Sequence, residues 1–150
     1  SIIYWMDRKS INLYAEQLTK TLAFKAGKKP ATASGVDIIH DFWKGRGIDP
    51  NSINTVDGSG LSPGDRITTQ SMARILQSAT KESWFNDFYE SLPVYNDMKM
   101  KSGTINNCLA FAGYQTHGGH SLSFSIIINN YSGPAAAMRQ KMFRVLDELK

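Results

Sequence analysis

The sequence predicts an α+β domain in which helices come first, an antiparallel sheet follows, and a last helix packs on that sheet. Three observations predict this class: helical spacing of apolar residues in the first half, apolar β-forming segments after Pro93, and a proline-led helical segment at the end. The chain has 150 residues, 41% hydrophobic and 20% charged, which suits one globular domain with a buried core. We therefore predict a single unit over residues 1–150.

The first half is predicted to be helical and then to form one long loop. Residues 11–24 repeat apolar side chains at helical spacing, and Ser10 stands where an N-cap would. A second helix is expected over residues 34–44, with Gly45 as its stop. Residues 45–68 are rich in Gly, Ser, Asn, Asp and Pro, and a loop of this length is usually functional or disordered.

Two short helices are expected between this loop and Pro93. The apolar residues that mark them are Met72, Ile75, Leu76 and Ala79 in the first helix and Trp84, Phe85, Phe88 and Tyr89 in the second.

The segments after Pro93 predict the sheet. Residues 99–104 are expected to form a strand, and residues 109–115 and 122–129 form a β-hairpin around a turn at 116–120. The run Ile126-Ile127-Ile128 predicts a strand buried on both faces.

The last helix is expected to begin at Ser132-Gly133-Pro134, with proline near its first position. Its core positions are Met138, Met142, Val145 or Leu146, and Leu149.

Charge and the few metal-binding residue types limit the function. The net charge is +4, from 17 basic and 13 acidic residues, and only Lys28-Lys29 forms a local basic pair, so nucleic acid is not expected as a partner. A mild positive field favours a substrate with a free carboxylate. The single Cys108 excludes an internal disulfide. His117 and His120 have no Cys or carboxylate near them in sequence, so we expect no metal and no other cofactor.

Two short motifs carry the candidate chemistry: Ser10-Ile11-Asn12 and Lys101-Ser102-Gly103-Thr104. Ser-x-Asn and Lys-Thr/Ser-Gly are two of the three elements of the serine penicillin-recognising enzymes. Between and after them come Asp57-Gly58-Ser59-Gly60-Leu61-Ser62 and Phe111-Ala112-Gly113-Tyr114. In this order, over nearly the whole chain, the sequence resembles the C-terminal part of D-alanyl-D-alanine carboxypeptidase/endopeptidases of the penicillin-binding protein 4 type. The resemblance implies a β-lactamase/transpeptidase-like fold, present in part.

The resemblance implies acyl transfer through a serine ester and gives three residues a catalytic role. Lys101 supplies a positive field for the terminal carboxylate of the substrate. Ser10 relays a proton to the leaving amine, and Asn12 holds the substrate amide and the catalytic lysine.

The same resemblance implies substrate binding by Ser102, Gly103 and Thr104. The hydroxyls of Ser102 and Thr104 face the carboxylate, and the backbone N–H of Thr104 forms half of the oxyanion hole. Residues 57–62 form a structural loop beneath the site, whose glycines adopt backbone shapes closed to other residues.

The nucleophile of this family lies in a Ser-x-x-Lys motif that precedes Ser-x-Asn. No such motif stands before Ser10, so we expect the nucleophile and a signal peptide in a missing N-terminal part, and we expect the isolated chain to be inactive. Ser78-Ala79-Thr80-Lys81 matches the motif literally. It follows Ser-x-Asn and stands at the end of a predicted helix, whereas a reactive serine gains from a helix start.

The implied partners are a peptidoglycan stem peptide ending in D-Ala-D-Ala, β-lactam antibiotics and the missing N-terminal part of the protein. A homo-oligomer is also expected if the chain exposes apolar surface. The implied location is the periplasm or cell envelope. Two other functions stay open: a catalytically inactive peptidoglycan-binding module, and a β-lactamase-like hydrolase. The loop at residues 57–62 favours the carboxypeptidase by resemblance.

Overall fold

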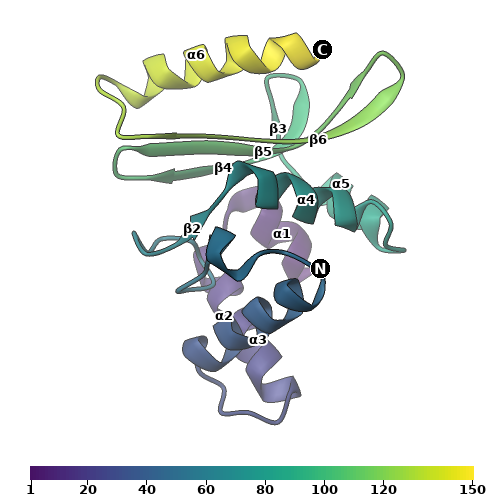
Figure 1. Ribbon diagram of the computed structural model, residues 1–150, viewed down its shortest axis with the longest axis vertical. Coiled ribbons are helices and arrows are strands. Elements are labelled where there is room, and N and C mark those ends of the chain that lie inside the picture. The colour runs from purple at the N-terminus through teal and green to yellow at the C-terminus, as the bar shows by residue number, and fades with distance from the viewer. The chain divides into compact units, whose positions relative to one another are not determined.

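The computed structural model describes all of residues 1–150, which form two compact units, Ser1–Ser71 and Met72–Lys150 (Figure 1). The prediction of a single domain over residues 1–150 stays a prediction. None of the helices combines the length with the apolar composition that a membrane crossing requires.

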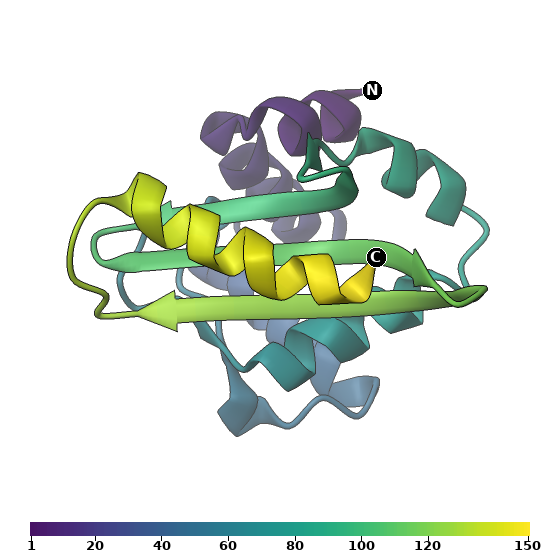
Figure 2. The same cartoon turned by 90° about the horizontal axis from the view of Figure 1, so that it is seen from above.

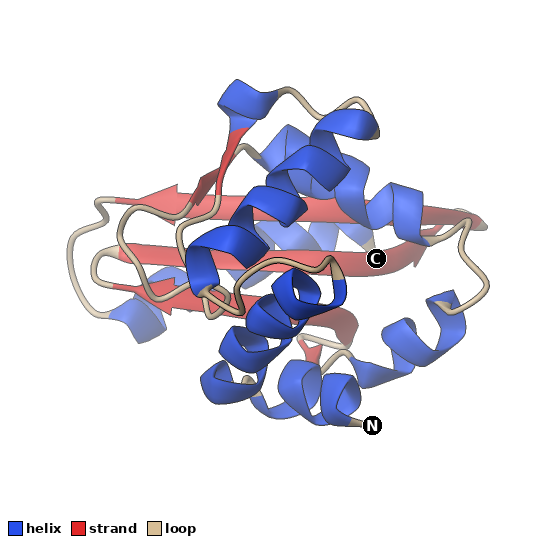
Figure 3. Cartoon of the chain, turned by 90° about the horizontal axis from the view of Figure 1, so that it is seen from below, coloured by secondary structure: helices blue, strands red, loops and turns tan.

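The first unit consists mainly of helices joined by loops (Figure 3). Its elements are α1 (Ile2–Lys9), α2 (Asn12–Lys25), α3 (Thr32–Gly45), the 3-10 turn η1 (Pro50–Ser52) and the paired strands β1 (Ile53–Asn54) and β2 (Arg66–Ile67). The expected helices at 11–24 and 34–44 are confirmed as α2 and α3.

Helix α1 is absent from our sequence prediction although its ends carry helix signals. The hydroxyl of Ser1 caps it by accepting a hydrogen bond from the Tyr4 N–H at 3.2 Å, and Arg8 and Lys9 stand in its last turn. Both features stabilise a helix, the first through its free N–H groups and the second through its dipole. Eight residues with no buried side chain give little apolar periodicity to detect.

Helices α2 and α3 cross closely because Gly35 leaves room for backbone contact. A Cβ on Gly35 would collide with the carbonyl oxygen of Thr19 and lie 2.7 Å from its carbonyl carbon. Thr19 itself is buried, and its hydroxyl donates to the carbonyl of Ala15 at 3.0 Å. A glycine inside a helix costs stability, and here the close crossing accounts for it.

The expected long loop at 45–68 contains regular structure. The carboxylate of Asp49 accepts a hydrogen bond from the Asn51 N–H at 2.9 Å and so starts η1. Ile53 then pairs with Ile67, and Asn54 with Arg66. Strands of two residues are too short to show alternation, which explains why the sequence did not reveal them.

Helices α4 (Thr69–Ala79) and α5 (Phe85–Ser91) precede the sheet of the second unit, as expected. The first three residues of α4, Thr69 to Ser71, still belong to the first unit. The sheet is antiparallel in the order β3 (Val94–Tyr95), β4 (Met98–Ile105), β5 (Cys108–His117) and β6 (His120–Asn129). Helix α6 (Ala135–Leu146) lies across one face of this sheet, as Figure 2 shows. The 3-10 turn η2 (Asp147–Leu149) follows it. The α+β class with a closing helix on the sheet is confirmed.

The β5–β6 hairpin is tighter than the expected turn at 116–120. His117 pairs with His120, so only Gly118 and Gly119 form the turn. Both glycines have positive φ, 55° and 80°, as a two-residue hairpin turn that follows strand twist requires.

Each face of the sheet has its own apolar core. The core under α6 contains Met98, Met100, Leu109, Phe111, Phe124, Met142 and Leu146. The opposite face carries Leu76, Leu92 and Tyr114, with α4 and α5 residues packed around them. Leu146 is 3% exposed and Val145 is 60% exposed, so Leu146, and not Val145, is the core residue of this turn of α6. The predicted double-sided burial of Ile126-Ile127-Ile128 is wrong, because β6 is the outermost strand and these side chains stay partly exposed.

Candidate functional site

Ser10 and Asn12 lie at the junction between α1 and α2. Ser10 is the C-cap of α1, with φ 54° and ψ 51°, and its backbone N–H bonds to the Met6 carbonyl. It is not the N-cap of α2: that position belongs to Ile11, which offers no side-chain hydrogen bond, and Asn12 is the first helical residue. A non-glycine residue in the left-handed region is strained, and such strain gathers at functional sites.

The loop at residues 57–62 is organised by the carboxylate of Asp57. One oxygen accepts hydrogen bonds from the Gly60 N–H at 2.5 Å and the Ser59 hydroxyl at 3.2 Å, and the other accepts from the Ser62 N–H at 2.8 Å. Burial raises the pKa of Asp57, but these hydrogen bonds together outweigh it and hold the pKa below its ordinary value. The loop is therefore built around an ionised side chain.

Asp65 is a second carboxylate of this region, and sequence reasoning did not single it out. Its Oδ1 accepts a hydrogen bond from the Val56 N–H at 2.6 Å, while its Oδ2 is buried without a hydrogen-bond partner. Burial, together with the charge of Asp57, raises the pKa of Asp65. The pKa of Asp57 is therefore lowered and the pKa of Asp65 is raised.

Replacing Asp57 by asparagine is expected to destabilise the protein by about 1–2 kcal/mol near neutral pH, because an amide accepts hydrogen bonds at only one of its two terminal atoms. Folding lowers the pKa of Asp57, so its carboxylate adds stability above the unfolded pKa and loses that contribution as pH falls through the folded pKa. The difference between wild type and variant in urea unfolding should shrink from about pH 7 to about pH 3. A difference that stays constant with pH would contradict this role.

The motif Lys101–Thr104 lies on β4, and strand alternation separates its side chains. The register pairs Lys101 with Ala112, on the face away from α6. Ser102 pairs with Phe111, so Ser102 and Thr104 lie on the face that α6 covers in part. The Lys101 ammonium donates to the Ser102 carbonyl at 3.1 Å.

The backbone of this motif runs along an edge of the sheet. Strand β3 pairs only with Met98 and Lys99, so no strand of the sheet pairs with residues 101–105 on that side. The N–H of Met100 donates to the Pro93 carbonyl at 3.0 Å on this side. Because backbone groups alternate sides along a strand, the N–H of Thr104 points the same way, away from β5. Gly103 and Thr104 are both exposed.

Lys99 shares a strand and a face with Lys101 but has a different environment. Its ammonium pairs with the Glu90 carboxylate at 2.9 Å and lies 5.3 Å from the centroid of the Tyr89 ring. These contacts give Lys99 a structural use.

Tyr114, the last residue of the segment Phe111-Ala112-Gly113-Tyr114, has a structural role. Its buried hydroxyl donates to the Leu76 carbonyl at 2.7 Å, and burial raises its pKa to about 12. It therefore joins β5 to α4 as a neutral hydrogen-bond donor.

Ser78 stands in the last turn of α4, as the sequence predicted. Its hydroxyl donates back to the Ile75 carbonyl at 2.7 Å. A serine bonded to its own helix and placed near the negative end of that helix lacks what activates a nucleophile.

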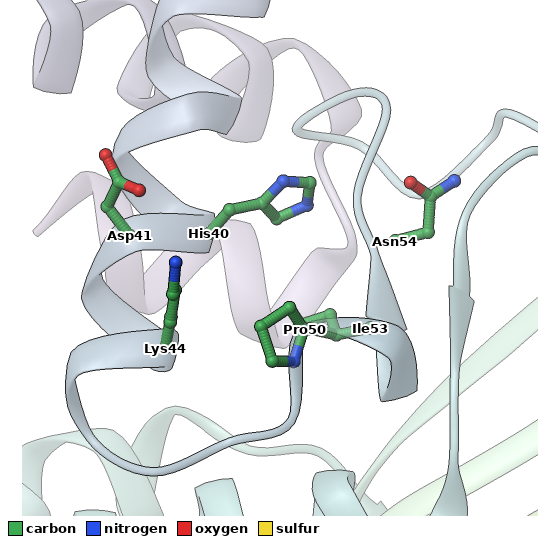
Figure 4. A pocket seen from close by; sticks show the side chains of 6 residues that line it. All are labelled: His40, Asp41, Lys44, Pro50, Ile53 and Asn54. Carbon is green, nitrogen blue, oxygen red and sulfur yellow. The ribbon is translucent and has the colours of Figure 1, made fainter.

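The three histidines do not converge on a metal centre, and no group of three or more metal-ligating side chains occurs in the structure. A small cavity of about 190 Å³ in the first unit is lined by His40, Asp41, Lys44, Pro50, Ile53 and Asn54 (Figure 4). His40 accepts a hydrogen bond from the Thr55 N–H at 2.9 Å, which fixes its ring beside the β1 segment. The cavity contains none of the motif residues.

The two motifs thus lie in different units. Ser10 and Asn12 belong to Ser1–Ser71 and lie two residues apart, whereas Lys101, Ser102, Gly103 and Thr104 belong to Met72–Lys150 and follow one another on β4.

Comparison with known proteins gives a family and a fold. Residues 1–96 match the family described as "D-Ala-D-Ala carboxypeptidase 3 (S13) family". The chain is 27% identical over 147 residues to the D-alanyl-D-alanine carboxypeptidase of Actinomadura sp. (strain R39), covering 84% of this chain and 27% of that protein. It is 24% identical over 147 residues to the D-alanyl-D-alanine carboxypeptidase DacB of Haemophilus influenzae, covering 85% and 31%. The chain thus spans about a third or less of the length of these relatives.

Solved structures show the same fold. Penicillin-binding protein 4 of Haemophilus influenzae superposes with a TM-score of 0.85 at 22% identity, over 99% of this chain and 39% of that one. A predatory endopeptidase of Bdellovibrio bacteriovorus superposes with a TM-score of 0.71 at 16% identity, over 99% and 42%. The expected fold, present in part, is therefore confirmed.

Proposed function

Since the chain belongs to the D-Ala-D-Ala carboxypeptidase 3 (S13) family, we propose that it forms part of a serine D-alanyl-D-alanine carboxypeptidase/endopeptidase that acts on peptidoglycan stem peptides. The observation that supports this most is the position of Lys101–Thr104 on β4. A lysine and an outward backbone N–H on an unpaired edge give a substrate both a cation and a hydrogen-bond donor.

The proposed reaction splits a peptide bond in two steps. A serine hydroxyl attacks the carbonyl carbon of the penultimate D-Ala and forms an ester, and the terminal D-Ala leaves as an amine after taking up a proton. Water then hydrolyses the ester and frees the serine. Lys101 binds the carboxylate of the terminal D-Ala, and the Thr104 N–H stabilises the oxyanion of each tetrahedral intermediate.

The other motif residues have supporting roles in this proposal. Ser10 relays the proton to the leaving amine, and Asn12 holds the substrate amide and the catalytic lysine. Gly103 belongs to the same substrate-binding segment, and Ser102 and Thr104 offer hydroxyls to the substrate carboxylate. The hydroxyls of Ser102 and Thr104 lie on the sheet face opposite the Lys101 side chain. In this proposal the substrate lies along the strand edge, where groups from both faces can contact it.

The nucleophile in this proposal belongs to a Ser-x-x-Lys motif outside residues 1–150. The proposed active protein is periplasmic or held at the cell envelope, where its substrate is found, and β-lactams acylate the same serine. Residues 1–150 alone neither hydrolyse D-Ala-D-Ala nor form a penicilloyl ester.

The proposal is tested by measuring D-Ala release from a stem peptide ending in D-Ala-D-Ala. The full-length protein is expected to release D-Ala, and a chain of residues 1–150 is expected to release none. Binding of the peptide by the full-length protein without release would instead identify a catalytically inactive peptidoglycan-binding module. Faster opening of a β-lactam than of the peptide would identify a β-lactamase-like hydrolase.

A further inference from the structure

Glu16 connects three segments of the unit Ser1–Ser71 through one carboxylate. Its Oε1 accepts hydrogen bonds from the backbone N–H groups of Gly58 at 2.9 Å and Ser59 at 3.0 Å. Its Oε2 accepts a hydrogen bond from the Thr32 hydroxyl at 3.3 Å. Helix α2, the loop at 57–62 and the start of α3 therefore meet at this side chain.

The loop backbone lies directly on α2 at the same place. A Cβ on Gly58 would collide with the Thr19 hydroxyl and stand 2.7 Å from the Ala15 carbonyl oxygen. This close approach permits only glycine, and it brings the N–H groups of the loop within reach of Glu16.

The start of α2 needs support of this kind. Ser10 has a left-handed backbone, and the Ile11 N-cap gives the first turn no side-chain hydrogen bond. Strained conformations persist only where the surrounding structure holds them. Glu16 stands four residues after Asn12, so both side chains lie on one side of the helix, one turn apart.

We propose that Glu16 is a positioning residue that clamps the loop at 57–62 onto α2 and so holds Ser10 and Asn12 in place for acylation. The clamp follows from the contacts above, and its effect on acylation rests on the proposed function. Glu16 acts through Asn12 and touches no substrate.

Three variants of the full-length protein separate positioning from general stability. Glu16→Ala removes both oxygens. Glu16→Gln keeps an oxygen for Gly58 and Ser59 and an amide group beside the Thr32 hydroxyl. Gln17→Ala alters the next residue of the same helix, whose side chain is exposed, and serves as the matched control.

The first measurement is amide hydrogen exchange at Gly58 and Ser59, well below the melting temperature of each variant. We expect exchange at both amides to rise about 10-fold or more in Glu16→Ala and to stay near wild type in Glu16→Gln and Gln17→Ala. Unchanged exchange in Glu16→Ala would overturn the clamp. This readout needs no catalytic activity.

The second measurement is the acylation rate with a fluorescent penicillin. Glu16→Ala is expected to lower it about 10- to 100-fold, while Glu16→Gln stays within about 3-fold of wild type. In an Asn12→Ala background, Glu16→Ala should add less than about a further 3-fold, because residues that act together are not additive. Equal losses in both backgrounds would overturn positioning through Asn12.

The two proposals fail in different ways. No acylation of the wild-type protein by penicillin would contradict the proposed function, and the amide exchange at Gly58 and Ser59 would still decide whether Glu16 holds the loop.

Discussion

Lys101→Ala in the full-length protein is expected to lower the rate of acylation by penicillin about 100-fold or more. The ammonium of Lys101 is proposed to bind the carboxylate of the ligand, and loss of one electrostatic group placed before reaction costs about 10²–10³ in rate. The rate is measured from the fluorescence of labelled protein at a series of penicillin concentrations. Thermal unfolding of the variant should stay close to wild type, because Lys101 is a partly exposed strand residue.

Lys99→Ala is the matched control for this prediction. Lys99 lies two residues earlier, on the same strand and the same face, and is held by Glu90. Its loss removes an ion pair whose Glu90 side chain is exposed, so the pair is worth less than about 1 kcal/mol. The variant is expected to keep the acylation rate within about 3-fold of wild type. Equal losses in the two variants would mean that general positive charge, and not the motif lysine, serves acylation.

Gly113→Ala is expected to destabilise the protein by about 3 kcal/mol, the upper part of the range for an overpacked core. A Cβ at Gly113 would collide with the Lys99 carbonyl oxygen and lie 2.5 Å from both Cα and Cβ of Met100. The β4–β5 ladder would have to separate to admit it. Urea unfolding measures the loss as a lower midpoint.

Gly103→Ala tests the same strand pair without a collision. A Cβ there would meet only the Ala110 Cβ, at an ordinary 3.7 Å. The free energy of unfolding of the variant is expected to lie within about 0.5 kcal/mol of the wild-type value. Comparable destabilisation at the two glycines would show that the close approach at Gly113 does not decide the stability of this ladder.

The second unit was the more predictable half of the fold. Its hairpin and closing helix have strong signals: two glycines between β-rich runs, a proline before the helix, and apolar residues such as Met142 and Leu146 at core spacing. The sequence did not predict how far Ile126–Ile128 are buried. Burial on both faces depends on which elements lie beside the strand, and the pattern of apolar residues does not show that β6 is the outermost strand.

The first unit is held by contacts distant in sequence, and these limited the prediction. Serine is a residue type that favours N-caps, but Ser10 is the C-cap of α1, a helix that the sequence did not predict. Glu16 gave no sign of its role, because the Gly58 and Ser59 amides that it binds lie more than forty residues away. The motifs themselves were visible, while their geometry was not.

The most direct test of the account is to label the full-length protein with fluorescent penicillin and to map the labelled serine by mass spectrometry. The proposed function predicts a label on a serine outside residues 1–150, within a Ser-x-x-Lys motif, and labelling about 100-fold slower in Lys101→Ala. A label on Ser78, or on any other serine within residues 1–150, would contradict it.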